Sequence, residues 1–232
     1  FIPVLVFVLI MNYWPMLGIR YAFYDFKPIG TPTFVAFKHF EKMFATDAFW
    51  NAFKNTLQLS IMKLLITTFT SVVVSVFLNE MGNLFVKKTL QTLIYLPHFM
   101  SWAVVAGIFY LLLNPTSTGM VNGILRDIGF LAEEEAGIYF LADSEIWRPI
   151  FYLINIWKET GWGTIIFLAT LSGINPELYE AADIDGATRL QKVWYITVPA
   201  LTNTIVTVLI LNLAKVMNMF ESVFVLYNNA VY

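Results

Sequence analysis

Charged side chains lie inside stretches of sequence that are otherwise apolar enough to cross a membrane, and besides Lys63 of the stretch 56–78 there are three. Lys158 and Glu159 are adjacent near the middle of the stretch 149–171, and Lys215 lies within the stretch 196–220. A charge inside a membrane is costly and usually marks a functional position, such as the path of a solute. The chain offers no nucleophile, base and metal-ligand set at catalytic spacing. We therefore predict no catalytic residue and no metal site.

The neighbours of these charges favour a path for a polar solute. Counted at 1.5 Å per residue, Lys158 and Lys215 lie about 20–24 Å from one membrane face, so they share a depth. Nearby amides and an indole suit the polar edges and flat faces of sugar rings. An equally supported alternative is that Lys158 or Glu159 pairs with Lys215 or Glu221 for helix packing alone. The predicted substrate path comprises Trp157, Lys158, Glu159, Asn212, Lys215 and Asn218.

The composition indicates a protein dissolved in lipid. Of the 232 residues, 58% are hydrophobic and 13% are charged, whereas soluble domains average about a quarter charged residues. The net charge of −2 favours no nucleic-acid partner. There is no cysteine, which excludes disulfides and thiolate chemistry.

The apolar stretches predict an all-α, polytopic helical membrane protein with one transmembrane domain over residues 1–232. Pro97 and Gly107 predict a kinked third span, and His98 beside the proline is interpreted as a packed residue rather than a proton relay. The interval 20–55 suits an amphipathic linker better than a docking surface for a binding protein. A sixth span is expected beyond residue 232. The five predicted spans are 1–19, 56–78, 89–113, 149–171 and 196–220.

A short polar helix-turn-helix is predicted over 175–195, between the fourth and fifth spans. Asn175 is a suitable N-cap, and Pro176 suits the first helical position. Gly186 breaks the helix without steric cost if the turn needs a positive φ. The small side chains of Ala181 and Ala182 let another surface approach closely.

This stretch resembles the signature of permease subunits of bacterial type I ABC importers. The family pattern is Glu-Ala-Ala, three residues, Gly, nine residues, Ile, one residue and Leu-Pro. Here Val198 stands in place of the leucine, which is a conservative apolar change. The matching positions are Glu180, Ala181, Ala182, Gly186, Ile196 and Pro199.

Other segments resemble the carbohydrate-importing branch of that family, including permeases for oligosaccharides. They include Asn55-Thr56-Leu57, Tyr95-Leu96-Pro97 and Ile156-Trp157-Lys158. A further segment runs from Leu168-Ala169-Thr170-Leu171 into Ile174-Asn175-Pro176-Glu177-Leu178-Tyr179. The resemblance implies a sugar or oligosaccharide as the solute.

The resemblance also implies the partners and the source of energy. It implies a second permease subunit, identical or different, two ATP-binding subunits, an external solute-binding protein and a location in the bacterial cytoplasmic membrane. The chain has no P-loop pattern, so ATP and Mg²⁺ are expected on the ATPase, which docks on the coupling segment. Glu180 would anchor that contact and Gly186 would set the helix angle. Asp185 would cap the second helix or pair with a basic residue across the interface.

Two other classes of function remain as alternatives. The same kind of importer can carry peptides, amino acids or other solutes. An ion-coupled secondary transporter would use the intramembrane charges without an ATPase, but it leaves the segment 175–195 unexplained. The location of lysine and arginine does not decide the orientation, because the interval 20–55 carries more of them than the two loops placed in the cytoplasm by the resemblance.

Overall fold

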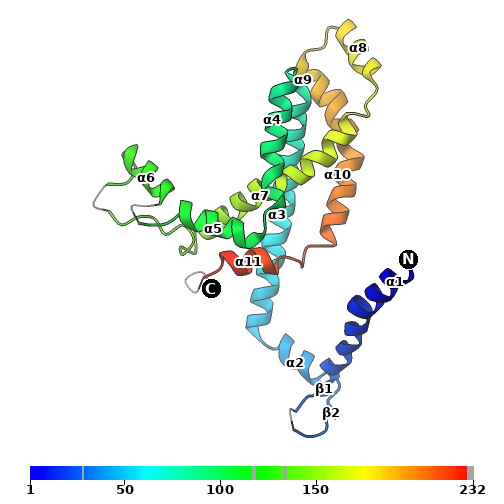
Figure 1. Ribbon diagram of the computed structural model, residues 1–232, viewed down its shortest axis with the longest axis vertical. Helices are drawn as coiled ribbons and strands as arrows, with labels where there is room; N and C mark the ends of the chain where they lie inside the picture. Colours follow the sequence, from blue (N-terminus) through cyan, green and yellow to red (C-terminus); the bar gives the residue numbers. More distant parts are fainter. Residues whose placement is uncertain (28, 117–118, 133–134, 229–232) are drawn as a thin grey trace. The chain divides into compact units, whose positions relative to one another are not determined.

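The computed structural model describes residues 1–27, 29–116, 119–132 and 135–228, and almost all of its regular structure is helical (Figure 1). Its contacts divide the chain into two compact units, Phe1–Asn55 and Thr56–Tyr232. The all-α prediction is confirmed. Two-residue strands, β1 (Tyr24–Asp25) and β2 (Thr33–Phe34), form the sheet that the described residues contain.

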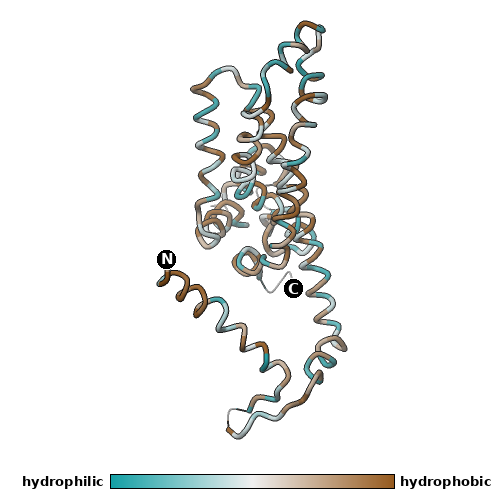
Figure 2. The backbone as a smooth tube through the Cα atoms, turned by 90° about the vertical axis from the view of Figure 1, so that its right-hand side faces the viewer, coloured by the Kyte–Doolittle hydropathy of each residue, from teal (hydrophilic) through white to brown (hydrophobic). Residues whose placement is uncertain are grey.

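The first unit begins with one long apolar helical stretch. It consists of α1 (Ile2–Val8), a π-helical turn (Leu9–Tyr13) and a 3-10 segment (Trp14–Phe23). None of the residues of this stretch is buried within the structure, and Figure 2 shows hydrophobic residues along its N-terminal end. A helix of this length and apolarity is suited to lipid on its exposed faces.

The segment after this helix, predicted as an amphipathic linker, contains a strand pair and a short helix. Phe34 belongs to the antiparallel pair of β1 with β2, in which Tyr24 pairs with Phe34. The short helix α2 (Lys38–Phe44) follows, and α3 (Asp47–Glu80) then begins nine residues before the predicted second span. At 1.5 Å per residue α3 is about 51 Å long, which exceeds the hydrocarbon thickness of a bilayer.

The second unit is a bundle in which α7 (Trp147–Leu171) packs against three other elements. These are α4 (Leu84–Tyr95), the 3-10 turn Leu96–Phe99 and α10 (Val198–Leu213). Ten residues of α7 are buried, and they include the polar side chains of Asn155, Lys158, Thr160 and Thr164. The span predicted over 149–171 is thus a helix that encloses several polar groups, and it is not one of the helices that are apolar enough by themselves to cross a membrane.

Three helices of the described residues are long and apolar enough to cross a membrane: Ile2–Phe23, Asp47–Glu80 and Arg189–Leu213. A fourth crossing would combine α4 and the 3-10 turn with α5 (Trp102–Leu112), although these two arms meet at 106°. Pro97 lies in the 3-10 turn, while Gly107 lies within α5. The predicted kink is therefore a full break, and Gly107 does not cause it.

The helix predicted over 196–220 ends earlier, at Leu213. Beyond it the backbone forms short i to i+3 hydrogen bonds, from Lys215 N to Asn212 O (2.9 Å) and from Asn218 N to Lys215 O (2.8 Å). A new helix, α11 (Phe220–Leu226), then begins. Lys215 and Asn218 consequently lie in an exposed turn rather than in a transmembrane helix. The polar residues at this point fit a turn better than a continuous apolar helix.

The close approach of α7 to α4 supplies a test of the packing. A Cβ on Gly161 would lie 2.9 Å from Tyr95 Cα and closer still to the carbonyl oxygen of Ile94. These are backbone atoms, so the helices would have to separate. We expect Gly161→Ala to destabilise the protein by about 1–3 kcal/mol, measured as a lower thermal midpoint in detergent. Gly107→Ala, where a Cβ meets nothing within 4 Å, is the matched control and should leave the midpoint unchanged.

Candidate coupling segment and solute path

The predicted helix-turn-helix begins with α8 (Pro176–Ile184), which starts where the sequence indicates. Asn175 caps it, since its Oδ1 accepts from Glu177 N at 3.1 Å, and Pro176 occupies the first helical position. Figure 1 shows α8 and α9 (Arg189–Lys192) at the end of the second unit where α3 ends and α4 begins. The α3–α4 turn and the coupling segment therefore lie at the same end, as the order of the spans predicts.

Gly186 ends α8 in the conformation that its position demands. Its φ is +74°, a left-handed value that glycine adopts without strain. Gly186 N donates to Asp183 O at 3.1 Å, and Ala187 N donates to Ala182 O at 2.9 Å. This pair of bonds is the Schellman closure of a helix C-terminus. The prediction that the turn uses a positive φ at Gly186 is confirmed.

The second helix is capped by Thr188 and not by Asp185. Thr188 Oγ1 accepts from Gln191 N, and the Gln191 side chain accepts from Thr188 N at 2.7 Å, which makes a reciprocal capping box. Asp185 is instead the C-terminal cap residue of α8 and is exposed. The alternative that Asp185 pairs across an interface remains a prediction.

Two side-chain contacts connect α8 to the helix that follows the turn. Tyr179 Oη lies 2.9 Å from Oγ1 of Thr197, a fully buried residue in the π-helical turn Val193–Thr197. Lys192 Nζ donates to Asp183 Oδ1 at 2.6 Å. The ion pair is largely exposed on its aspartate side and contributes little. The buried hydroxyl contact is the stronger connection between α8 and the base of α10.

Removing that hydroxyl contact tests whether it fixes the angle of α8. We expect Tyr179→Phe to cost about 1 kcal/mol, because α8 would move more freely relative to α10. Through the ATPase coupling that the sequence resemblance implies for this segment, it should also lower the amount of solute carried per ATP hydrolysed. The measurement is uptake and ATP hydrolysis by the reconstituted complex. Tyr195→Phe is a suitable control, since Tyr195 is exposed in the same turn. Equal ratios for the two variants would contradict this role.

Most residues of the family signature lie on the outer surface of this segment. Glu180, Ala181 and Pro199 are exposed, and Ala182 is half-buried. Ile196 is half-buried in the π-helical turn that leads into α10. The segment thus presents an acidic side chain beside small residues, which leaves space for another protein surface.

Lys158, predicted in the solute path, is buried, and its amino group donates hydrogen bonds within the protein. Its Nζ donates to the carbonyl oxygens of His98 at 3.0 Å and Met100 at 2.8 Å. It also lies 5.3 Å from the ring centroid of Trp102, and the residue is only 4% exposed. These carbonyls belong to the break between the 3-10 turn and α5. Lys158 therefore holds that break against α7.

Glu159, the next residue of α7, points to a different group. Its Oε2 lies 3.2 Å from Nδ1 of His98, without hydrogen-bond alignment. The His98 ring stacks on Trp162, with centroids 5.1 Å apart and planes at 14°. His98 is thus a packed residue, as the sequence indicates, and it is also the partner of an intramembrane acid.

The remaining predicted path residues are dispersed. Trp157 packs edge-on against Phe109 at 5.4 Å and is partly exposed. Asn212 is exposed near the end of α10, and Lys215 and Asn218 follow in the turn. Among the described residues, no hydrogen bond, ion pair or ring contact joins these three to Trp157, Lys158 or Glu159. The alternative ion pairs with Lys215 or Glu221 are not formed either.

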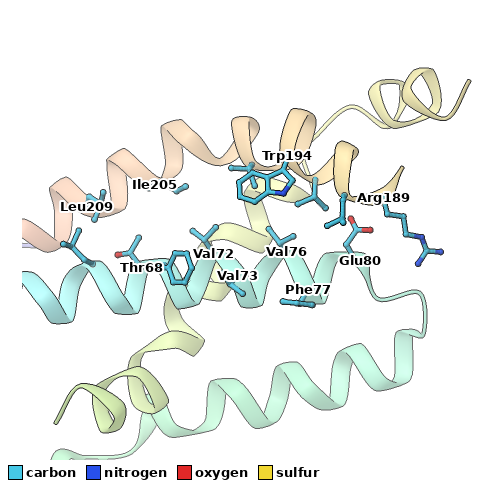
Figure 3. A pocket seen from close by; sticks show the side chains of 15 residues that line it. Thr68, Val72, Val73, Val76, Phe77, Glu80, Arg189, Trp194, Ile205 and Leu209 are labelled. Atoms are coloured by element: carbon cyan, nitrogen blue, oxygen red, sulfur yellow. The ribbon is translucent and has the colours of Figure 1, made fainter. Parts of the chain in front are cut away.

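A groove of about 680 Å³ separates the C-terminal half of α3 from α9 and the start of α10. Figure 3 shows Trp194 facing Val72 and Val76, with Glu80 and Arg189 at one end of the groove. Its walls are almost entirely apolar. A sugar needs hydrogen-bond partners that such walls lack, so the groove does not suit the solute path.

Sequence reasoning assigned no role to three residues that the structure places at these sites: Trp162, Tyr179 and Thr197. It also did not predict that His98 contacts Glu159. The partners come from different elements of the chain, as Tyr179 does from Thr197 and Glu159 does from His98. Only the tertiary structure brings these elements together.

The structure is a bundle of helices with an exposed polar helix-turn-helix between two of them, as the resemblance to transport permeases implies. The model of the family described as "Binding-protein-dependent transport system inner membrane component" matches residues 71–227. The chain belongs to this family, which comprises transport subunits, and is a multi-pass protein of the bacterial inner membrane.

Individual comparisons agree with this assignment. The chain is 40% identical over 231 residues to the polygalacturonan/rhamnogalacturonan transport system permease protein YteP of Bacillus subtilis, covering 98% of this chain and 70% of the relative. It is similar to a chain in the crystal structure of a bacterial ABC transporter involved in the import of the acidic polysaccharide alginate. That match has a TM-score of 0.87 and 38% identity, and it covers 99% of this chain and 76% of the other.

The same likeness holds for an alginate transporter in complex with an alginate pentasaccharide-bound periplasmic protein. Here the TM-score is 0.86 at 38% identity, with 100% of this chain and 76% of the other covered. The predicted family is confirmed.

Proposed function

We propose that the protein is the permease subunit of an ATP-driven importer that moves an oligosaccharide across the bacterial cytoplasmic membrane. The observation that carries this proposal is the similarity, at 38% identity over 99% of the chain, to a subunit of an alginate importer. The name of YteP, which also refers to polysaccharide transport, supports the same solute class. Alginate is an acidic polysaccharide, so acidic oligosaccharides are the first candidates.

The proposed partners follow from the same reasoning. A solute-binding protein would deliver the saccharide from outside, a second permease would complete the path, and two ATPase subunits would bind ATP and Mg²⁺. The alginate transporter crystallised with its periplasmic protein supports the first of these. The protein itself would perform no covalent chemistry.

The coupling segment would transmit ATPase closure to the membrane helices. The ATPase would contact the exposed face that carries Glu180 and Ala181, and α8 would move with α10 because Tyr179 and Thr197 connect them. Gly186 closes α8 and fixes its direction. Rigid-body rocking of one helix bundle against another is a common form of alternating access in transporters.

Uptake into proteoliposomes that contain the complete complex and its binding protein tests the proposal. The panel would contain acidic oligosaccharides, neutral oligosaccharides, short peptides and amino acids, each with and without ATP. We expect ATP-dependent uptake of a saccharide. Uptake of peptides or amino acids alone would retain the importer class and reject the sugar, whereas uptake that follows an ion gradient without ATP would reject the importer.

A further inference from the structure

The apolar groove lies between two of the helices that are long and apolar enough to cross a membrane. One wall is α3, within Asp47–Glu80, and the other is α9 with the start of α10, within Arg189–Leu213. The lining along α3 runs from Leu65 to Glu80. At the helical rise this is about 22 Å, whereas one leaflet of bilayer hydrocarbon is about 15 Å thick. The groove is therefore long enough to hold an acyl chain of one leaflet.

The walls of the groove suit a hydrocarbon chain. Figure 3 shows Val72 and Val76 of α3 facing Trp194 of the other wall. Phe69 and Trp194 are 70% and 65% exposed, so their rings make few dispersion contacts within the chain. An acyl chain would supply such contacts, and it needs no hydrogen-bond partner from the walls.

Two side chains of opposite charge lie at one end of this apolar groove (Figure 3). Glu80 is the last residue of α3, and Arg189 is the first residue of α9. Both are exposed, and among the described residues neither forms a hydrogen bond or an ion pair. Lys192, the other cation of α9, is paired with Asp183. Because Glu80 and Arg189 terminate membrane-length helices, they lie near the depth of lipid headgroups.

This pair of charges matches a headgroup that carries both signs. A guanidinium donates two parallel hydrogen bonds to a phosphate, and a primary ammonium donates to a carboxylate. Phosphatidylethanolamine has both groups above its acyl chains. Phosphatidylglycerol has no cation, so its phosphate would lie beside the unneutralised carboxylate of Glu80. Phosphatidylcholine has a trimethylammonium group without an N–H, so it cannot donate a hydrogen bond to that carboxylate.

We propose that the groove binds phosphatidylethanolamine from the leaflet on the side of the coupling segment. One acyl chain lies between α3 and α10, Arg189 binds the phosphate, and Glu80 accepts from the ammonium group. Trp194, about 8 Å along the helix from Arg189, lies at the level that indoles favour in membranes. The lipid thereby connects α3 to the base of α10, the helix that follows the coupling segment. This binding is independent of which solute the protein carries.

Photo-crosslinking tests this proposal on the complete complex with its ATPase subunits and no substitution. The purified complex in detergent receives a trace of phosphatidylethanolamine with a diazirine in its acyl chain, and crosslinked peptides are identified by mass spectrometry. We expect crosslinks to the groove walls on α3 and α10. Unlabelled phosphatidylethanolamine at about ten times its Kd should lower them about tenfold by mass action. Phosphatidylglycerol at the same concentration should lower them only about threefold, since an exposed ion pair is worth up to about fivefold in affinity.

Two substitutions at the charged end of the groove and one control make the result specific. Glu80→Gln should remove the advantage of phosphatidylethanolamine over phosphatidylglycerol as a competitor, and Arg189→Gln should lower crosslinking up to about fivefold. Lys88→Gln, an equal loss of charge on an exposed residue of α4 outside the groove, should change neither result.

The unsubstituted complex decides the proposal even if a variant does not assemble. Equal competition by the two lipids would overturn the assignment of the headgroup. An absence of crosslinks to the groove walls would show that another protein segment or subunit fills the groove, and it would overturn the proposal as a whole.

Discussion

Replacing Gly186 by valine is expected to abolish most solute uptake while ATP hydrolysis continues. The φ of +74° is strained for any residue with a Cβ, by about 1–2 kcal/mol for ordinary side chains and more for a β-branched one. The backbone would relieve that strain by rotating to a negative φ. Both closing hydrogen bonds, from Gly186 N and Ala187 N, would then be lost and α8 would point in a new direction.

The expected loss of uptake is about tenfold or more, since each 1.4 kcal/mol lost from the free energy of the coupling contact corresponds to a factor of ten. The measurement is solute carried per ATP hydrolysed in proteoliposomes, together with the amount of complex in the membrane. Gly186→Asn is the matched control, because asparagine tolerates the left-handed region, and it should retain most uptake. Equal uptake by the valine variant and the natural protein would contradict this role for Gly186.

Local features of the coupling segment were predictable from the sequence because each depends on neighbouring residues. Asn175 is within two residues of the amide that it caps, and Gly186 satisfies a turn formed by its own flanks. The sequence does not distinguish Asp185 from Thr188 as the cap of the second helix, since several polar residues near a turn are able to cap a helix. Thr188 does so here because Gln191, three residues on, completes the capping box.

The solute path was harder to predict because it depends on contacts between distant segments. Depth along a helix, counted in residues, placed Lys158 and Lys215 at the same level, but it assumed one continuous helix beyond residue 213. That assumption is wrong, because the helix ends at Leu213 and Lys215 lies in a turn. The break at Pro97 likewise decides the partners of Lys158 and Glu159, and the sequence indicates a kink there without indicating its 106° angle.

Replacing Lys158 by methionine is expected to destabilise the break between the 3-10 turn and α5. Two opposing effects decide the outcome. Removing a buried ammonium group relieves its desolvation cost, but it leaves the carbonyl oxygens of His98 and Met100 without this donor. Each lost charge-assisted hydrogen bond costs about 1.5–3 kcal/mol in soluble proteins, and measured values inside membranes are smaller, averaging about 0.6 kcal/mol.

We therefore expect a net loss of about 2 kcal/mol for Lys158→Met, measured as a lower thermal midpoint of the purified complex in detergent. Lys215→Met is the matched control: Lys215 is exposed, so its removal should leave the midpoint unchanged. A higher midpoint for Lys158→Met would show that desolvation outweighs the two hydrogen bonds, and Lys158 would then be held in place for a function other than stabilising the break.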